Sequence, residues 1–109
     1  MRVIDTDLAI ENAGGDLALA KELYRMLQAE LPNYQQAISE SYQQNDLEQL
    51  YNHVHKLNGS ATYCGVPGLK QAAHTFESHL KGNHPEHYPE DHERLQAEIA
   101  ALMSIPEMK

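Results

Sequence analysis

The sequence predicts an all-α domain, an antiparallel up-and-down four-helix bundle with a short N-terminal helix. Four long segments carry apolar residues mainly at steps of three and four, which is the spacing of one buried helix face. Glycines, prolines and an Asn-Asp pair separate these segments, and helices commonly end at such residues. Amphipathic helices joined by short links can bury their apolar faces only against each other, so a bundle follows. The 109 residues suit a single domain, residues 1–109.

The first two helices are expected from their caps and their apolar spacing. Residues 5–13 form the short helix, which Asp5 or Thr6 can cap and which two following glycines end. Over about 16–44 we expect one continuous, bent helix, because Pro32 removes a hydrogen bond from its middle. The spacing predicts that this helix buries Ala20, Tyr24, Leu27, Leu31, Tyr34, Ile38 and Ser41.

The remaining helices follow from similar signals. The third is expected over about 46–63, the fourth from beyond the break at Gly65 to Gly82, and the last over about 89–104. Residues 83–90 contain two prolines and no periodicity, so they are predicted to form a loop. The predicted buried faces are Leu47, Leu50, Tyr51, Val54, Leu57 and Ala61 in the third helix, Leu69, Ala72, Ala73, Phe76 and Leu80 in the fourth, and Leu95, Ile99, Leu102 and Met103 in the last.

Composition narrows the classes of partner. Sixteen acidic and eight basic residues give a net charge of −8, which argues against binding to nucleic acid or to an anionic membrane surface. No apolar run is long enough to cross a membrane, and the N-terminus lacks the pattern of a signal peptide. The single cysteine, Cys64, cannot form an internal disulfide, which fits a reducing cytoplasm.

His55 is the candidate functional residue of the third helix. It lies roughly 110° from the centre of the apolar face, at 100° per residue, so its ring should sit on the rim of the core, open to solvent. Gly59 lies one turn further on, and a glycine inside a helix costs about 1 kcal/mol relative to alanine. Close approach of another molecule is a common reason for such a residue. The polar neighbours that would frame this space are Tyr51, Asn52, Asn58 and Thr62.

The run His55-Lys56-Leu57-Asn58-Gly59-Ser60 resembles the His-x-Leu-Lys-Gly-Ser signature of histidine-containing phosphotransfer (HPt) domains. These helical modules relay phosphoryl groups in two-component signalling. The sequence from the histidine to Tyr63-Cys64-Gly65-Val66-Pro67 is most like the C-terminal HPt domain of BarA-type hybrid sensor kinases. One position departs from the family pattern: Asn58 stands where a lysine is usual, so the usual cation near the phosphate is missing.

The resemblance implies a phosphorelay role without ATP-dependent kinase activity. His55 would accept a phosphoryl group from a receiver-domain aspartate and pass it to a response-regulator aspartate. Glu77 of the following helix, about 80° off its own apolar face, matches the family position that often accepts a hydrogen bond from Nδ1, which would make Nε2 the nucleophile. Asn58, Ser60 and the backbone near Gly59 could donate hydrogen bonds to the phosphoryl oxygens, and Lys56 is a nearby cation. The expected docking face comprises Tyr51, Asn52, Thr62 and Tyr63.

The resemblance also carries expectations about partners. We expect no cofactor bound by this chain, because Mg²⁺ would be supplied by the receiver partner. The partners would be the receiver domain of a hybrid sensor kinase and a response regulator, with no nucleic acid and no direct membrane contact. One exposed histidine must be reached by two partners in turn, so the chain should be a monomer. It should be cytoplasmic, or tethered to the inner membrane if it is part of a full-length sensor kinase.

Two alternatives compete with the relay. The bundle could be a helical protein-interaction module that is never phosphorylated, with Asn58 marking a lost activity. The other alternative is a histidine-rich metal site built from His84, His87 and His92. No cysteine joins these histidines, so no metal site is expected. Cys64 is expected to act as a small packing residue. The acidic residues expected on a solvated face are Glu86, Glu90, Asp91, Glu93 and Glu98.

Overall fold

Helices make up all the regular structure in the residues that the computed structural model describes, 3–107. This confirms the predicted all-α fold class. In chain order the helices are α1 (Thr6–Asn12), α2 (Leu17–Gln43), α3 (Leu47–Ala61), α4 (Pro67–Lys81), the short 3₁₀ helix η1 (Pro85–His87) and α5 (Tyr88–Met103).

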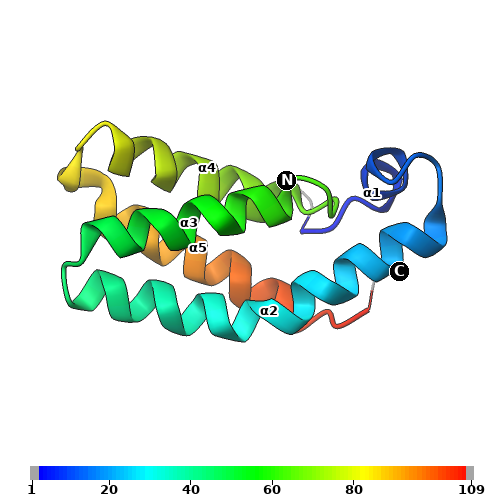
Figure 1. The fold of residues 1–109 in the computed structure, drawn as a ribbon, viewed down its shortest axis with the longest axis horizontal. Helices are drawn as coiled ribbons and strands as arrows, with labels where there is room; N and C mark the ends of the chain where they lie inside the picture. The colour runs from blue at the N-terminus through cyan, green and yellow to red at the C-terminus, as the bar shows by residue number, and fades with distance from the viewer. Residues whose placement is uncertain (1–2, 108–109) are drawn as a thin grey trace.

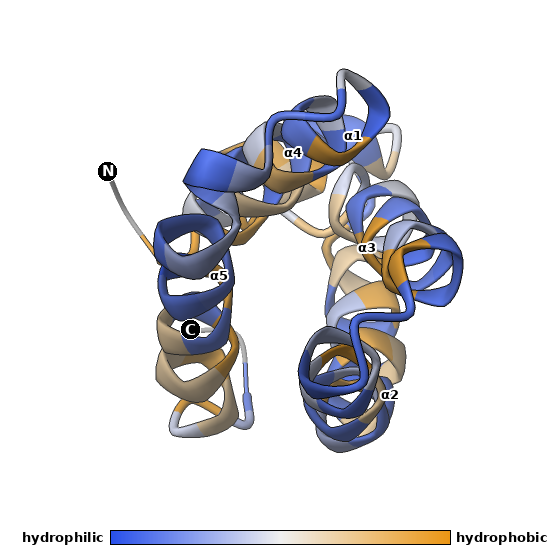
Figure 2. Ribbon diagram, turned by 90° about the vertical axis from the view of Figure 1, so that its left-hand side faces the viewer, coloured by the Kyte–Doolittle hydropathy of each residue, from blue (hydrophilic) through white to orange (hydrophobic). Residues whose placement is uncertain are grey.

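The four long helices form an antiparallel bundle in which each contacts the next. α3 packs against both α2 and α4, and α5 closes the bundle by packing against α4 and α2 (Figure 1). Viewed end-on, the helices surround a common centre, with much of their apolar sequence turned toward it (Figure 2). Each of these helices therefore buries one face and leaves another open to solvent.

Aspartates begin three of the helices. Asp5, Asp16 and Asp46 each accept a hydrogen bond from the backbone N–H three residues further on, at 3.1, 3.1 and 3.3 Å. These bonds satisfy N–H groups that have no partner inside the helix. α4 instead begins at Pro67, a position where the missing N–H of proline costs nothing.

α2 is continuous through Pro32, as predicted. Figure 1 shows the helix changing direction between its two halves, and Pro32 lies near its middle with an exposed ring. A proline in a helix interior removes one backbone hydrogen bond and its ring crowds the preceding turn, which accounts for a bend. The bend lets the second half of α2 follow α3 while the first half extends past the bundle to carry α1.

The core follows the predicted faces closely. It contains, among others, Tyr24, Leu27, Leu31 and Ile38 of α2, Leu50, Val54, Leu57 and Ala61 of α3, Leu69, Ala72, Ala73 and Phe76 of α4, and Leu95, Ile99 and Leu102 of α5. Tyr34, Tyr51 and Leu80 are half-buried at its edge. The prediction was wrong for two residues: Leu47 and Met103 are exposed. Leu47 is the first residue of α3, and Met103 lies one residue, or 100°, beyond Leu102, which takes the inward position.

The predicted loop over residues 83–90 is also wrong. Residues Pro85–His87 form η1, and α5 already begins at Tyr88, whose ring is buried near Phe76. Both prolines of this segment occupy first-turn positions of a helix, where they favour helix initiation instead of preventing it.

None of the helices within residues 3–107 is both long enough and apolar enough to pass through a bilayer.

Candidate functional site

His55 lies on the solvent side of α3. Val54, directly before it, and Leu57, two residues after it, are fully buried against the core. This fixes the rotation of α3, so the His55 ring projects from the rim of the bundle with 64% of its side chain exposed. The rim position predicted from helix geometry is therefore present.

Glu77 of α4 meets the His55 ring at the α3–α4 boundary. Its neighbour Phe76 is fully buried, which holds this turn of α4 against α3. The Nδ1 atom of His55 forms a hydrogen bond with Oε1 of Glu77, whose side chain is only 13% exposed. A carboxylate accepts only, so Nδ1 carries a proton, and in the neutral ring Nε2 then keeps its lone pair. Nε2 has no hydrogen-bond partner among the described residues.

Asn58 completes this cluster from one turn further along α3. Its Nδ2 donates to Oε2 of Glu77 at 2.9 Å, so the two oxygens of Glu77 are divided between His55 and Asn58. The other amide atom, Oδ1, is buried and has no partner within residues 3–107. The Asn58 amide is therefore hydrogen-bonded to the Glu77 carboxylate, which lies on the Nδ1 side of the His55 ring.

Tyr51 and Gly59 border the histidine along the helix. The Tyr51 ring is nearly parallel to the His55 ring, with centroids 5.8 Å apart and planes 10° apart. At Gly59 a Cβ atom would meet no other atom within 4 Å, apart from the helix's own backbone. The space beside His55 is thus open, as the glycine suggested.

Lys56 and Ser60 lie on the other side of α3, toward α2. The Ser60 hydroxyl is 3.5 Å from the hydroxyl of Tyr34, and Lys56 lines a groove of about 250 Å³ together with Glu30 and His53. The structure therefore does not bring either side chain together with Glu77 and Asn58.

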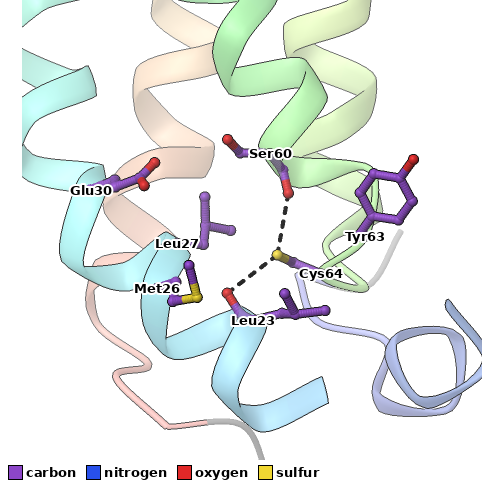
Figure 3. Close-up of a pocket in the computed structure, with 7 residues that line it drawn as sticks. All are labelled: Leu23, Met26, Leu27, Glu30, Ser60, Tyr63 and Cys64. Carbon is purple, nitrogen blue, oxygen red and sulfur yellow. Dashed lines mark hydrogen bonds between the residues drawn. The ribbon is translucent and has the colours of Figure 1, made fainter. Parts of the chain in front are cut away.

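A second groove continues along the α2–α3 boundary, with a volume of about 170 Å³ (Figure 3). It is mainly apolar, and Tyr63 and Met26 at its edge are well exposed. Figure 3 shows the Cys64 sulfur between the two sides of the groove, where it donates to the carbonyls of Leu23 and Ser60. The residues that line the groove are Leu23, Met26, Leu27, Glu30, Ser60, Tyr63 and Cys64.

The residues of the expected docking face do not form one uniform surface. Asn52 is exposed one turn before His55. Thr62 is half-buried, with its hydroxyl donating to the backbone oxygen of Asn58 at 2.9 Å. Tyr63 belongs to the α2–α3 groove.

Cys64 is buried, as a packing residue would be. Burial raises the pKa of its thiol to about 11, with a further contribution from the charge of Glu30. The thiolate is the nucleophilic form of cysteine, and at neutral pH this thiol stays protonated.

The remaining histidines gather partly near η1. The rings of His79 and His87 stack with centroids 4.2 Å apart, and His84 meets His79 edge-on at 6.2 Å. Across residues 3–107, no three or more histidine, cysteine or acidic side chains are arranged to hold a metal ion.

The expectation that Asp91 lies on a solvated face is wrong. Asp91 is buried, and its Oδ2 lies 2.5 Å from Nδ1 of His79. Glu98 is half-buried, while Glu86, Glu90 and Glu93 are exposed. The spacing contained a signal for Asp91, because it stands four residues before Leu95 on the same inward face of α5. A polar residue on the buried face of a helix needs a hydrogen-bond partner, and for Asp91 that partner is His79.

Sequence reasoning placed His55 and Glu77 at the same boundary but did not find the bond between Asn58 and Glu77. Asn58 was expected to face a phosphoryl group. Its position three residues after His55 puts it on the same side of α3 as Glu77, and this spacing was the available signal.

Comparisons with known proteins agree with the fold. Residues 22–105 match the Hpt domain family. The sensor histidine kinase GacS of Pseudomonas protegens is 37% identical over 81 residues, which are 74% of this chain and 9% of that protein. The histidine-protein kinase BarA of Escherichia coli K12 is 31% identical over 100 residues, 92% of this chain and 10% of that protein. The chain thus spans about a tenth of the length of these relatives.

A solved structure of a similar domain supports the same family assignment. The HPT domain from a hybrid sensor histidine kinase of Shewanella matches with a TM-score of 0.89 and 29% identity, covering 95% of this chain and 90% of that one. The sequence resemblance to HPt domains is therefore confirmed. Because the family match covers most of the residues and the bundle agrees with a solved member, the chain belongs to the Hpt domain family.

Proposed function

We propose that this chain is a phosphorelay intermediate of two-component signalling. His55 accepts a phosphoryl group from an aspartate of a receiver domain and passes it to an aspartate of a response regulator. The observation that carries this proposal is the exposed His55 ring, whose Nδ1 is bonded to Glu77 while Nε2 faces outward without a partner in the described chain.

In the accepting step, the Nε2 lone pair attacks the phosphorus of an aspartyl phosphate. The P–O bond to the aspartate breaks as the P–N bond to Nε2 forms, and the aspartate leaves as a carboxylate. Because Nδ1 keeps its proton, the ring becomes positively charged in the product. Glu77 stabilises that charge through its hydrogen bond to Nδ1. The passing step reverses these bond changes on a second receiver domain.

Positioning dominates this kind of transfer, because its loose transition state leaves little covalent work for the protein. This chain contributes a rigid, exposed nucleophile of fixed tautomer. The Mg²⁺ ion and the remaining catalytic groups belong to the receiver partner, and ATP hydrolysis forms no part of the reaction.

The proposed partners follow from the relatives. GacS and BarA are sensor kinases, so we place this chain between a receiver domain of a hybrid sensor kinase and a response regulator. It acts as a monomer, since both partners must reach the same ring. We propose that it works in the cytoplasm, either free or attached to a membrane-bound kinase.

The test is label transfer from a phosphorylated receiver domain with Mg²⁺ present. Wild type should acquire an acid-labile label, and His55→Gln should acquire none. His53→Gln is the matched control, since it makes the same substitution on the same helix, at a half-buried residue that lines the groove toward α2. If wild type and His55→Gln both bind receivers and neither takes label, the chain is an interaction module.

A further inference from the structure

The His55 cluster contains a third member whose contacts indicate a role through Glu77. Asn58 donates its hydrogen bond to the Glu77 carboxylate, and the same carboxylate is bonded to the His55 ring. Its donor, Nδ2, lies 2.9 Å from Oε2 of Glu77. Two hydrogen bonds in series therefore link Asn58 to Glu77 and Glu77 to His55. They extend from the buried side of the α3–α4 boundary to the exposed ring.

The orientation of the Asn58 amide is set by the carboxylate. If its oxygen and nitrogen were exchanged, Oδ1 would face Oε2 of Glu77, and two acceptors would oppose each other. In the observed orientation Oδ1 is buried with no partner in residues 3–107. A buried acceptor without a partner is unfavourable, and an apolar side chain at this position would avoid it. The amide thus holds Glu77 at a cost to stability.

Glu77 has no basic partner other than His55 among the described side chains. Without Asn58, its carboxylate could rotate about its terminal torsion, since such sp² torsions are broad. Rotation would weaken the alignment of Oε1 with Nδ1 and favour water as the partner of either oxygen. The His55 ring would then lose the constraint that keeps the proton on Nδ1 and leaves Nε2 unprotonated.

We propose that Asn58 is a positioning residue, which fixes the Glu77 carboxylate so that His55 is held in the Nδ1–H tautomer with Nε2 free to be phosphorylated. The significance for transfer rests on the function proposed above. The tautomer itself can be measured on the isolated chain. A charged hydrogen bond of this kind is lost on substitution, so transfer to an Asn58 variant should slow by about tenfold or more.

The test uses ¹⁵N NMR of the unphosphorylated protein at a pH where its histidines are neutral. Long-range ¹H–¹⁵N correlations distinguish a protonated Nδ1 from a protonated Nε2. Wild-type His55 should be mainly the Nδ1–H form. Asn58→Ala and Asn58→Asp should each shift it toward the Nε2–H form, Asp more strongly because it sets a second carboxylate against Glu77. Asn58→Ser, which keeps a shorter donor, should lie between wild type and Asn58→Ala.

The matched control is Gln49→Glu, another amide-to-carboxylate change at an exposed side chain of α3, nearly two turns before His55. It should leave the tautomer unchanged. Amide spectra identify variants that fold, and Asn58→Ser is the conservative variant if the others do not. An unchanged His55 tautomer in folded Asn58→Ala would overturn the proposal, even if transfer is normal. A shifted tautomer in a chain that no receiver phosphorylates would instead reject the relay and retain the positioning role.

Discussion

At the residue scale, two glycines near the end of α3 differ in their surroundings. Gly59 is exposed within the helix and has open space where a side chain would project. Gly65 is buried in the link to α4, with φ of +65°. A Cβ on Gly65 would lie 2.5 Å from the backbone oxygen of Asp5. The first glycine thus leaves the site accessible, and the second allows α1 to be fastened to the bundle.

Replacing Gly59 with alanine should stabilise the chain and impair its function. Alanine is favoured over glycine in a helix by about 1 kcal/mol, and nothing clashes with the added methyl group. The same methyl occupies space beside His55 that an approaching receiver domain would need. We therefore expect urea unfolding to show higher stability for Gly59→Ala while the rate of label transfer falls. Transfer at the wild-type rate would show that this space is not used.

Gly65→Ala should have the opposite effect on stability. A left-handed conformation costs an alanine about 1–2 kcal/mol, and the clash with the Asp5 carbonyl adds to it, for a total of about 2–4 kcal/mol. The same unfolding measurement tests this. The prediction is contradicted if Gly65→Ala is as stable as wild type.

At the element scale, α2 and α5 are joined by a histidine that favours its neutral form. The ring of His92 stacks on Tyr42 with centroids 4.2 Å apart, and Gln96 donates to its Nε2 at 3.4 Å. Burial lowers the pKa of His92 from its ordinary value of 6.5. Folding therefore favours the unprotonated form of His92 at this contact between the two helices.

This predicts that acid weakens the α2–α5 contact. The unfolded chain takes up the proton near pH 6.5, whereas the folded chain does so only at lower pH, so stability falls as the pH drops through 6.5 toward the folded pKa. We expect wild type to lose unfolding free energy as the pH falls below 6.5, and His92→Gln to lose less. The control is His74→Gln, at an exposed histidine of α4, which should behave like wild type. Parallel losses in all three proteins would refute a role for His92.

The limits of prediction are also visible at this scale. Apolar spacing placed all the long helices, because burial of one face dominates their stability. It missed the short 3₁₀ helix Pro85–His87, since a proline that breaks a helix interior also suits the first turn of a helix. It failed at Asp91 because hydropathy treats a carboxylate as solvated, whereas a histidine on another helix provides a buried partner. Such pairs between helices depend on tertiary packing that a single sequence does not contain.

The arrangement of His55, Glu77 and Asn58 could also be predicted only in part. The rim positions of His55 and Glu77 follow from helix rotation alone. The bond from Asn58 to Glu77 could not be assigned in advance, because an amide beside a histidine could equally face a bound phosphoryl group. The distance of 2.9 Å between Asn58 and Glu77 decides in favour of the carboxylate in the unphosphorylated chain.

At the scale of the whole molecule, the bundle holds the His55 ring exposed at the α3–α4 boundary, with its Nδ1 bonded to Glu77. Packing against α2 and α4 fixes the rotation of α3, and α1 is fastened near the C-terminal end of that helix through the bond from Asp5 N–H to the Gly65 carbonyl, 2.7 Å long. Nothing in this arrangement requires the chain to change shape between an accepting and a passing step. We therefore expect two successive partners to use His55 in turn, without a rearrangement of the bundle between the two steps.

The most direct test combines three proteins: a labelled donor receiver domain, this chain and an unlabelled response-regulator receiver, with Mg²⁺. The account predicts that label reaches the second receiver only when the wild-type chain is present, and passes transiently through the chain. With His55→Gln, or with the chain omitted, the label should stay on the donor. Movement of label to the second receiver at the same rate with His55→Gln would contradict the account.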